Sequence, residues 1–164
     1  MKRVIGVTGM SVCGQKGHLK VASRCLTAVV AVTVMAACAT AYQDATNPIT
    51  GFTGGYWESK GPGQLVKVGF AGNAYIERGR VGTYLLYRSA EIAKREGKPY
   101  FAFYENLPAA VVDKRSSERS VKTVGGKPVT YAYILFFDAP EPGLLNAAEV
   151  IARLEPEVKG GPAK

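Results

Sequence analysis

The spacing of apolar residues in the second half of the chain predicts a mixture of strands and helices. Residues 56–59 form a short aromatic run, and residues 65–70 alternate between polar and apolar side chains, which is typical of a strand with one buried face. The glycines and proline of residues 60–63 predict a turn that joins these strands into a hairpin. From residue 79 to residue 96 the apolar positions recur every three to four residues, so we expect a helix that Gly97 ends.

Further strands and a second helix are expected toward the C-terminus. Residues 99–104 and 129–137 are dense in aromatic and β-branched side chains, which favours buried strands. Residues 144–154 again have a helical period. Residues 111–124 are largely polar and predict a loop between short edge strands. The order β-β-α-β-(β)-β-α predicts an α+β fold, with a largely antiparallel sheet of four to five strands and two helices packed on one face.

The N-terminal region has the order of a secretory signal. Residues 1–24 are basic, residues 26–35 are apolar, and two alanines precede Cys38. Met35-Ala-Ala-Cys38 resembles the bacterial lipobox, in which the cysteine becomes the lipidated first residue. Three interpretations stay open: a lipoprotein signal, a plain signal peptide cleaved near Ala37, and an uncleaved membrane anchor. The lipoprotein signal is favoured, and a start at Met10 leaves the pattern unchanged.

This interpretation divides the chain into four parts. We expect a lipoprotein signal peptide at 1–37, the lipidated Cys38 with a flexible tether to residue 55, one α+β domain at 56–156, and a disordered tail at 157–164. Several acyl chains hold a protein stably on a membrane. The residue after the cysteine is Ala39 rather than aspartate. This resembles the pattern that sends lipoproteins of Gram-negative bacteria to the outer membrane. The expected location is therefore the cell envelope, lipid-anchored at the outer membrane and facing the periplasm.

Charge and reactive residues exclude several classes of function. The 164 residues include 21 basic and 13 acidic side chains, but five of the basic ones precede residue 38, which leaves 16 against 13. This small excess argues against a nucleic-acid partner. Cys13, Cys25 and the only histidine, His18, would leave with the signal. Ser-His-Asp or Cys-His catalysis and zinc sites of nitrogen and sulfur ligands are then excluded, and we expect no metal and no cofactor.

Five polar residues form the strongest candidate site: Asn73, Tyr75, Arg78, Arg88 and Glu91. Arg88 and Glu91 are three residues apart on the predicted helix and can pair. One interpretation makes Asn73, Tyr75, Arg88 and Glu91 a polar pocket for a carboxylate or phosphate. The favoured interpretation is structural. In it, Arg88 ties the helix to the sheet through Glu91 and backbone carbonyls, while Asn73 takes a left-handed turn conformation.

The basic residues of segment 114–127 are a second candidate surface. They suit anionic lipid headgroups or a cell-wall polymer. Asp113 and Glu118 lie among them, so a solvated and partly self-neutralised loop is favoured. These basic residues are Lys114, Arg115, Arg119, Lys122 and Lys127.

Two functions from different classes follow. The first is a non-enzymatic binding or assembly role toward an envelope protein or cell-wall partner, for which Trp57 and Tyr104 are the expected exposed aromatic contacts. The alternative is a histidine-independent envelope hydrolase that uses carboxylate or tyrosine side chains. No spacing singles out a carboxylate pair, so no catalytic residue is assigned. The carboxylates considered are Glu58, Glu77, Glu91, Glu105 and Asp138.

Four sequence segments together resemble a family of small bacterial lipoproteins. They are Gly55-Tyr56, Val68-Gly-Phe-Ala-Gly-Asn-Ala-Tyr75, Leu85-Leu-Tyr-Arg-Ser-Ala-Glu91, and Gly97 with Tyr100-Phe101. Members of that family pair a lipobox with a G-N-x-Y and L-L-x-R-x-A-E body. The family has no assigned activity, so the resemblance implies a location and a fold class and supplies no catalytic residue.

Overall fold

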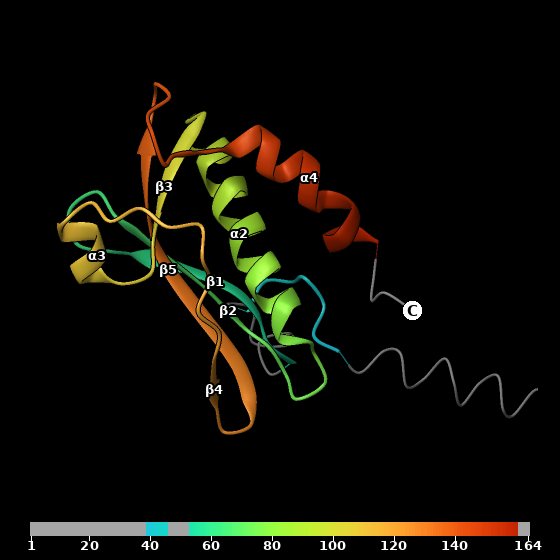
Figure 1. The fold of residues 1–164 in the computed structure, drawn as a ribbon. Helices are drawn as coiled ribbons and strands as arrows, with labels where there is room; N and C mark the ends of the chain where they lie inside the picture. The colour runs from blue at the N-terminus through green and yellow to red at the C-terminus, as the bar shows by residue number, and fades with distance from the viewer. Residues whose placement is uncertain (1–38, 46–52, 161–164) are drawn as a thin grey trace, which may run out of the picture. The chain divides into compact units, whose positions relative to one another are not determined.

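An antiparallel sheet organises the part of the chain that the computed structural model describes, residues 39–45 and 53–160 (Figure 1). These residues belong to the unit Cys38–Lys164. Along the sheet the strands have the order β1-β2-β5-β3-β6, and β4 pairs with β5 beside this path. The strands are β1 (Gly55–Lys60), β2 (Val66–Ala71), β3 (Tyr100–Tyr104), β4 (Lys122–Val124), β5 (Lys127–Phe137) and β6 (Leu145–Asn146).

The predicted hairpin is confirmed. β1 and β2 pair from Gly55 opposite Ala71 to Lys60 opposite Val66. Its turn closes where the Gly61 amide donates to the Leu65 carbonyl oxygen at 2.8 Å. The apolar face expected from the alternation is buried, because Val68 and Phe70 are fully enclosed.

β5 is the central strand and has neighbours along both edges. On one side it pairs with β2. On the other side it pairs with β4 through residues 127–129 and with β3 through residues 133–137. Because side chains alternate along a strand, Ala132 and Ile134 face the main core while Tyr131 and Tyr133 belong to a second cluster on the opposite face.

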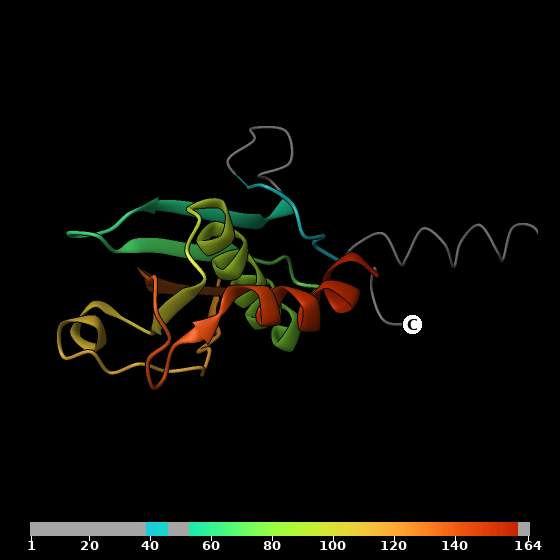
Figure 2. The same ribbon diagram turned by 90° about the horizontal axis from the view of Figure 1, so that it is seen from above.

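Two long helices lie on one face of the sheet, as predicted. They are α2 (Arg78–Arg95) and α4 (Ala147–Lys159), and α4 packs against α2 (Figure 2). The apolar stripe of α2 fills the main core, where Val81, Leu85 and Ile92 are buried. The fold class is therefore α+β with an open antiparallel sheet.

A third helix covers part of the opposite face. This helix, α3 (Leu107–Val111), was not predicted, because five residues are too few to show a helical period. Asn106 begins it by accepting a hydrogen bond from the Ala109 amide at 2.9 Å. Its apolar side chains pack against the cluster that contains Ala102 and Tyr104.

The predicted boundaries of the domain are wrong at both ends. Residues 39–45, expected to form a flexible tether, lie against the domain, and Asp44 pairs with Tyr56 in a parallel bridge. The C-terminal helix begins at Ala147 rather than at residue 144, because Asn146 caps it through the amides of its first turn. It continues through Pro156 to Lys159, since Val158 is buried in the core. The predicted disordered tail is thus helical at 157–159.

The remaining boundary predictions fall outside the described residues. These are the signal peptide at 1–37, the lipidated Cys38, residues 46–52 of the predicted tether, and residues 161–164 of the tail.

Candidate functional site

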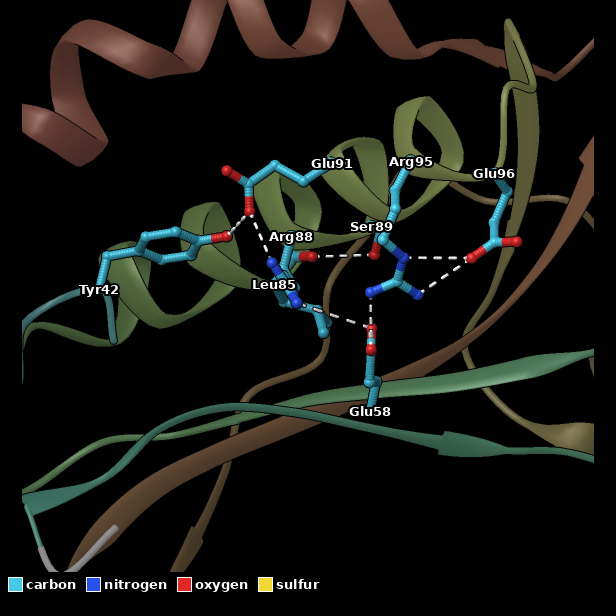
Figure 3. A network of polar contacts seen from close by, with 8 residues as sticks. All are labelled: Tyr42, Glu58, Leu85, Arg88, Ser89, Glu91, Arg95 and Glu96. Carbon is cyan, nitrogen blue, oxygen red and sulfur yellow. Dashed lines mark hydrogen bonds and ion pairs between the residues drawn. The ribbon is translucent and has the colours of Figure 1, made fainter. Parts of the chain in front are cut away.

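Arg88 lies at the centre of a polar network between α2 and β1 (Figure 3). Its Nη1 donates to Glu91 Oε2 at 3.0 Å, which confirms the predicted pairing along the helix. Its Nη2 lies 3.8 Å from Glu58 Oε2 on the sheet. Its guanidinium group stacks 4.0 Å from the centre of the Tyr56 ring. Arg88 therefore ties the helix to the sheet, as the structural interpretation expected, although through Glu58 and Tyr56 rather than backbone carbonyls.

Tyr42 joins this network from the segment that precedes the sheet. Its hydroxyl donates a hydrogen bond to Glu91 Oε2. Its ring packs against Tyr56, Tyr84 and Tyr87 at centroid distances of 4.9, 5.5 and 5.3 Å. Burial, together with the hydrogen bond to Glu91, raises the pKa of Tyr42 far above its usual range. The hydroxyl consequently stays protonated and acts as a donor.

A second arginine extends the network toward the end of α2. Arg95 Nη1 donates to Glu58 Oε1 at 2.8 Å, and its guanidinium also pairs with Glu96 at 3.1 Å. Glu58 thus lies between two guanidinium groups. Arg88 Nε is buried and has no hydrogen-bond partner among the described residues. The site is therefore strongly ionic but mostly neutralised within itself.

An open hollow of about 520 Å³ lies beside this network, between α2 and α4. Four basic side chains line it, against two acidic ones. Lys159 pairs with Glu155, Arg88 pairs with Glu91, and Arg95 pairs with Glu58 and Glu96, which do not line the hollow. The excess of positive charge therefore comes from Lys94, and it suits an acidic group such as a carboxylate or phosphate. The lining consists of Tyr87, Arg88, Glu91, Lys94, Arg95, Ile151, Glu155 and Lys159.

The four residues of the predicted polar pocket do not form one pocket. Arg88 and Glu91 line the hollow, but Asn73 and Tyr75 lie in the loop before α2 and do not line it. The Tyr75 amide donates to Asn73 Oδ1 at 3.0 Å, which makes a local turn. The prediction that Asn73 takes a left-handed conformation is also wrong. Among the described non-glycine residues, Asp113 has a positive φ and Asn73 does not.

Tyr42 is the member of the site that sequence reasoning missed. It was assigned to a tether because residues 39–45 contain few large apolar groups. Its partner Glu91 is 49 residues away along the chain, so no local period connects them. The available signal was Tyr42 itself, an aromatic side chain in an otherwise polar segment. Arg78, the fifth polar candidate, donates instead to Thr123 of β4 at 2.8 Å.

Most of the carboxylates considered for hydrolysis stand apart. Asp138 pairs with Lys98 at 2.8 Å, and Glu77 precedes the first turn of α2. Glu105 lines a small cavity of about 40 Å³. Glu58 and Glu91 approach the same guanidinium group, which holds both as partners in ion pairs.

Arg115 shows that the basic segment is neutralised in part, as expected. Its Nη2 pairs with Asp113 at 2.9 Å and with Glu141 at 2.8 Å. Its guanidinium also lies 5.1 Å from the Phe137 ring. Arg115 therefore holds the loop against the sheet and is not available to an outside partner.

The two aromatic residues expected at the surface differ in exposure. Tyr104 is buried, with 2% of its surface exposed, and the prediction that it forms a contact surface is wrong. Its position on β3 points it into the second cluster, beneath α3. Trp57 is half-buried and lies over Gly69 of the neighbouring strand, whose missing side chain leaves room for the indole ring.

The stability of the protein is expected to decline above pH 10, and Tyr104 accounts for a separable part of that decline. Burial and a hydrogen bond to Asp113 raise its pKa from 10.0 to about 12. Between these values the unfolded chain loses the proton while the folded protein keeps it, so the free energy of unfolding falls as pH rises. Since Asp113 is exposed to solvent, we expect Tyr104 to contribute about 1–2 kcal/mol of this loss.

Chemical denaturation at pH 9 to 12 measures this effect. The Tyr104→Phe variant should show a shallower decline than the natural chain. Tyr75→Phe removes the hydroxyl of an exposed tyrosine and serves as the matched control. Equal slopes for Tyr104→Phe and the natural chain would contradict the assignment.

The described residues contain neither a cluster of metal-ligating side chains nor a helix able to cross a membrane. Among them, no three His, Cys, Asp or Glu side chains converge as metal ligands would. None of the helices formed by these residues combines the length and the apolar character needed to cross a membrane.

No protein-family model, curated protein or solved structure matches this chain, so the resemblance to small bacterial lipoproteins stays a prediction.

Proposed function

We propose that this chain is an envelope lipoprotein, lipid-anchored through Cys38 at the outer membrane and facing the periplasm, which acts by binding or assembly and not by catalysis. The observation that carries the proposal is the burial of the segment that directly follows the lipobox cysteine. Thr40, two residues after the lipobox cysteine, is buried. Its hydroxyl donates to the Thr53 carbonyl oxygen at 2.7 Å and accepts a hydrogen bond from the Asn73 amide at 2.8 Å.

This burial suits a chain that is cleaved before Cys38. The partners of Thr40 are Thr53 and Asn73, and both lie on the C-terminal side of the cysteine. The segment is also held by backbone hydrogen bonds, because the Ala45 amide donates to Tyr56 and the Tyr56 amide donates to Gln43, both at 2.8 Å. Loss of the signal would therefore cost the domain none of these contacts.

The Arg88 site favours binding over the hydrolase alternative. A hydrolase of this kind requires a carboxylic acid that gives up a proton or a tyrosine that ionises. Glu58 and Glu91 are each held by arginine. The raised pKa values of Tyr42 and Tyr104 oppose ionisation of their hydroxyls. The basic hollow between α2 and α4 suits recognition of an acidic group on an envelope protein or a cell-wall polymer.

Intact-mass analysis of the membrane fraction tests this proposal. The full-length chain and its Cys38→Ala variant are produced in a Gram-negative host. We expect the natural chain to yield a species that begins at residue 38 and carries a diacylglyceryl thioether and an N-acyl chain. Cys38→Ala should lack this species and leave the membrane fraction or accumulate uncleaved.

Two results would contradict the anchor. One is an unmodified natural chain that retains residues 1–37, and the other is a soluble chain cleaved near Ala37. Cys25→Ala is the matched control, because it removes a cysteine of the expected signal. The mass of the lipidated species that begins at residue 38 should be unchanged in this variant.

A further inference from the structure

One end of the domain combines exposed apolar side chains with an excess of basic residues. It consists of residues 73–80, which run from the loop after β2 into the first turn of α2, and residues 122–127, which form the tip of the β4–β5 hairpin. Arg78 Nη2 joins the two by donating to Thr123 Oγ1 at 2.8 Å. Figure 1 shows both at the same end of the sheet, and we call them the basic end.

The composition of the basic end matches a membrane surface. Tyr75 and Val124 are 75% and 65% exposed, whereas most large apolar side chains of this domain are buried. Tyrosine is favoured where lipid headgroups meet water, and basic side chains are attracted to anionic lipid. One acidic residue, Glu77, stands against three exposed basic residues, which are Arg78, Lys122 and Lys127. Arg80 is half-buried and donates to the Glu157 carbonyl oxygen at 3.1 Å, so it is not counted in this surface.

Thr40, two residues after the lipobox cysteine, contacts the loop that forms part of this surface. Thr40 accepts a hydrogen bond from the Asn73 amide, in the same loop that carries Tyr75. Consecutive Cα atoms are about 3.8 Å apart, so the two peptide units that link Thr40 to the lipobox cysteine span at most about 7.6 Å. Acyl chains attached to Cys38 would therefore enter the bilayer next to residues 73–80.

We propose that the basic end rests on the membrane that holds Cys38, with Tyr75 and Val124 among the headgroups and the basic side chains on anionic phospholipid. This inference rests on the proposed lipid anchor. The contact orients the domain, because the acyl chains already hold it at the membrane. Each basic side chain contributes about fivefold to such a contact at low salt, and salt screens this contribution. α3 is held away from the bilayer in this orientation (Figure 1).

Quenching of a single tryptophan by brominated phospholipid tests the orientation. Trp57 is first replaced by phenylalanine, and Tyr75→Trp is then introduced as the reporter. The lipidated full-length product is reconstituted into vesicles of phosphatidylcholine with or without phosphatidylglycerol. Val111→Trp, at a position on α3 that is 85% exposed, is the matched control reporter.

We expect strong quenching of Tyr75→Trp in vesicles that contain phosphatidylglycerol and none of Val111→Trp. Adding Lys122→Gln and Lys127→Gln should weaken the contact by about 25-fold at low salt, since two fivefold factors are lost. High salt should weaken it as well. If circular dichroism shows that Tyr75→Trp is misfolded, Val124→Trp takes its place as the reporter.

The outcomes separate this inference from the proposed anchor. Lipidated protein, verified by mass, with an unquenched reporter at both Tyr75 and Val124 would overturn the orientation while the anchor stands. Equal quenching at Val111 and Tyr75 would also overturn it. Reporters that respond to added cell-wall polymer but not to lipid would replace the membrane with that polymer as the ligand. Absence of acyl chains on Cys38 would instead overturn the anchor itself.

Discussion

Replacing Tyr42 by alanine is expected to lower the free energy of unfolding by about 3 kcal/mol. Truncation of a large aromatic side chain in a packed cluster costs about 3–5 kcal/mol, and Tyr42 is at the lower end because its segment is partly exposed. The variant loses ring contacts with Tyr56, Tyr84 and Tyr87, and Glu91 loses a hydrogen bond. Urea denaturation followed by the fluorescence of Trp57, the only tryptophan, measures the change.

Tyr42→Phe separates the ring from the hydroxyl. It keeps the aromatic contacts and removes the donor to Glu91, so we expect a loss of about 1 kcal/mol. Gln43→Ala keeps the aromatic ring contacts and removes the hydrogen bonds of Gln43 Nε2 to Thr53 and Gly54, so it separates the contribution of the rings from that of the segment's other anchors. A flexible tether would make Tyr42→Ala silent, so an unchanged free energy of unfolding would refute the docked position of residues 39–45.

Replacing Arg88 by alanine is expected to cost about 2–3 kcal/mol of stability. Removing one partner of a fully buried ion pair costs about 3–5 kcal/mol, because the other charge is left without compensation. Arg88 has 18% of its side chain exposed and Glu91 has 29%, so water recovers part of that cost. The stacking of the guanidinium on Tyr56 is lost as well. Thermal or urea denaturation of Arg88→Ala provides the measurement.

A double-mutant cycle with Glu91→Gln isolates the contribution of the ion pair. Glu91→Gln keeps an acceptor for the Tyr42 hydroxyl but removes the charge. We expect the two changes to be coupled by about 1 kcal/mol, since the side chains are in direct contact. Arg88→Lys keeps the charge but lacks the planar fork, and should recover less than half of the loss. Purely additive effects would show that the pairing with Glu91 contributes nothing to the stability that Arg88 supplies.

The elements with strong periodicity were predictable from the sequence. The helix expected at 79–96 is Arg78–Arg95 in the structure, and the strand expected at 129–137 is the C-terminal part of Lys127–Phe137. Each contains enough apolar residues at regular spacing to fix its type and its buried face. The pairing of Arg88 with Glu91 was predictable for the same reason, because both lie on one helix at a fixed spacing.

The rest depended on contacts between distant parts of the chain. α3 and β6 are too short to show a period. α3 forms because Asn106 caps its first turn, and β6 forms because it pairs with β3. Tyr42 and Glu58 reach Arg88 only once the sheet and α2 have packed together. Asn73 and Tyr75 precede Arg78, the first residue of α2, and Arg78 itself lies about 15 Å along the helix axis from Arg88, at 1.5 Å per residue. Proximity in sequence to a helix therefore did not place them at its site.

The central position of β5 also sets the course of folding. Residues 127–137 supply the partners of β2, β3 and β4, so the sheet cannot assemble until almost five sixths of the chain has been made. Contacts between β2 and β5 join residues about sixty positions apart, from Ala71 opposite Val129 to Val66 opposite Ile134, and such long-range pairing slows the search for the native state. The domain should fold over milliseconds to seconds. Until β5 is made, the free edge of β2 and the facing edge of β3 have no partner strand, and α2 has no complete sheet to cover.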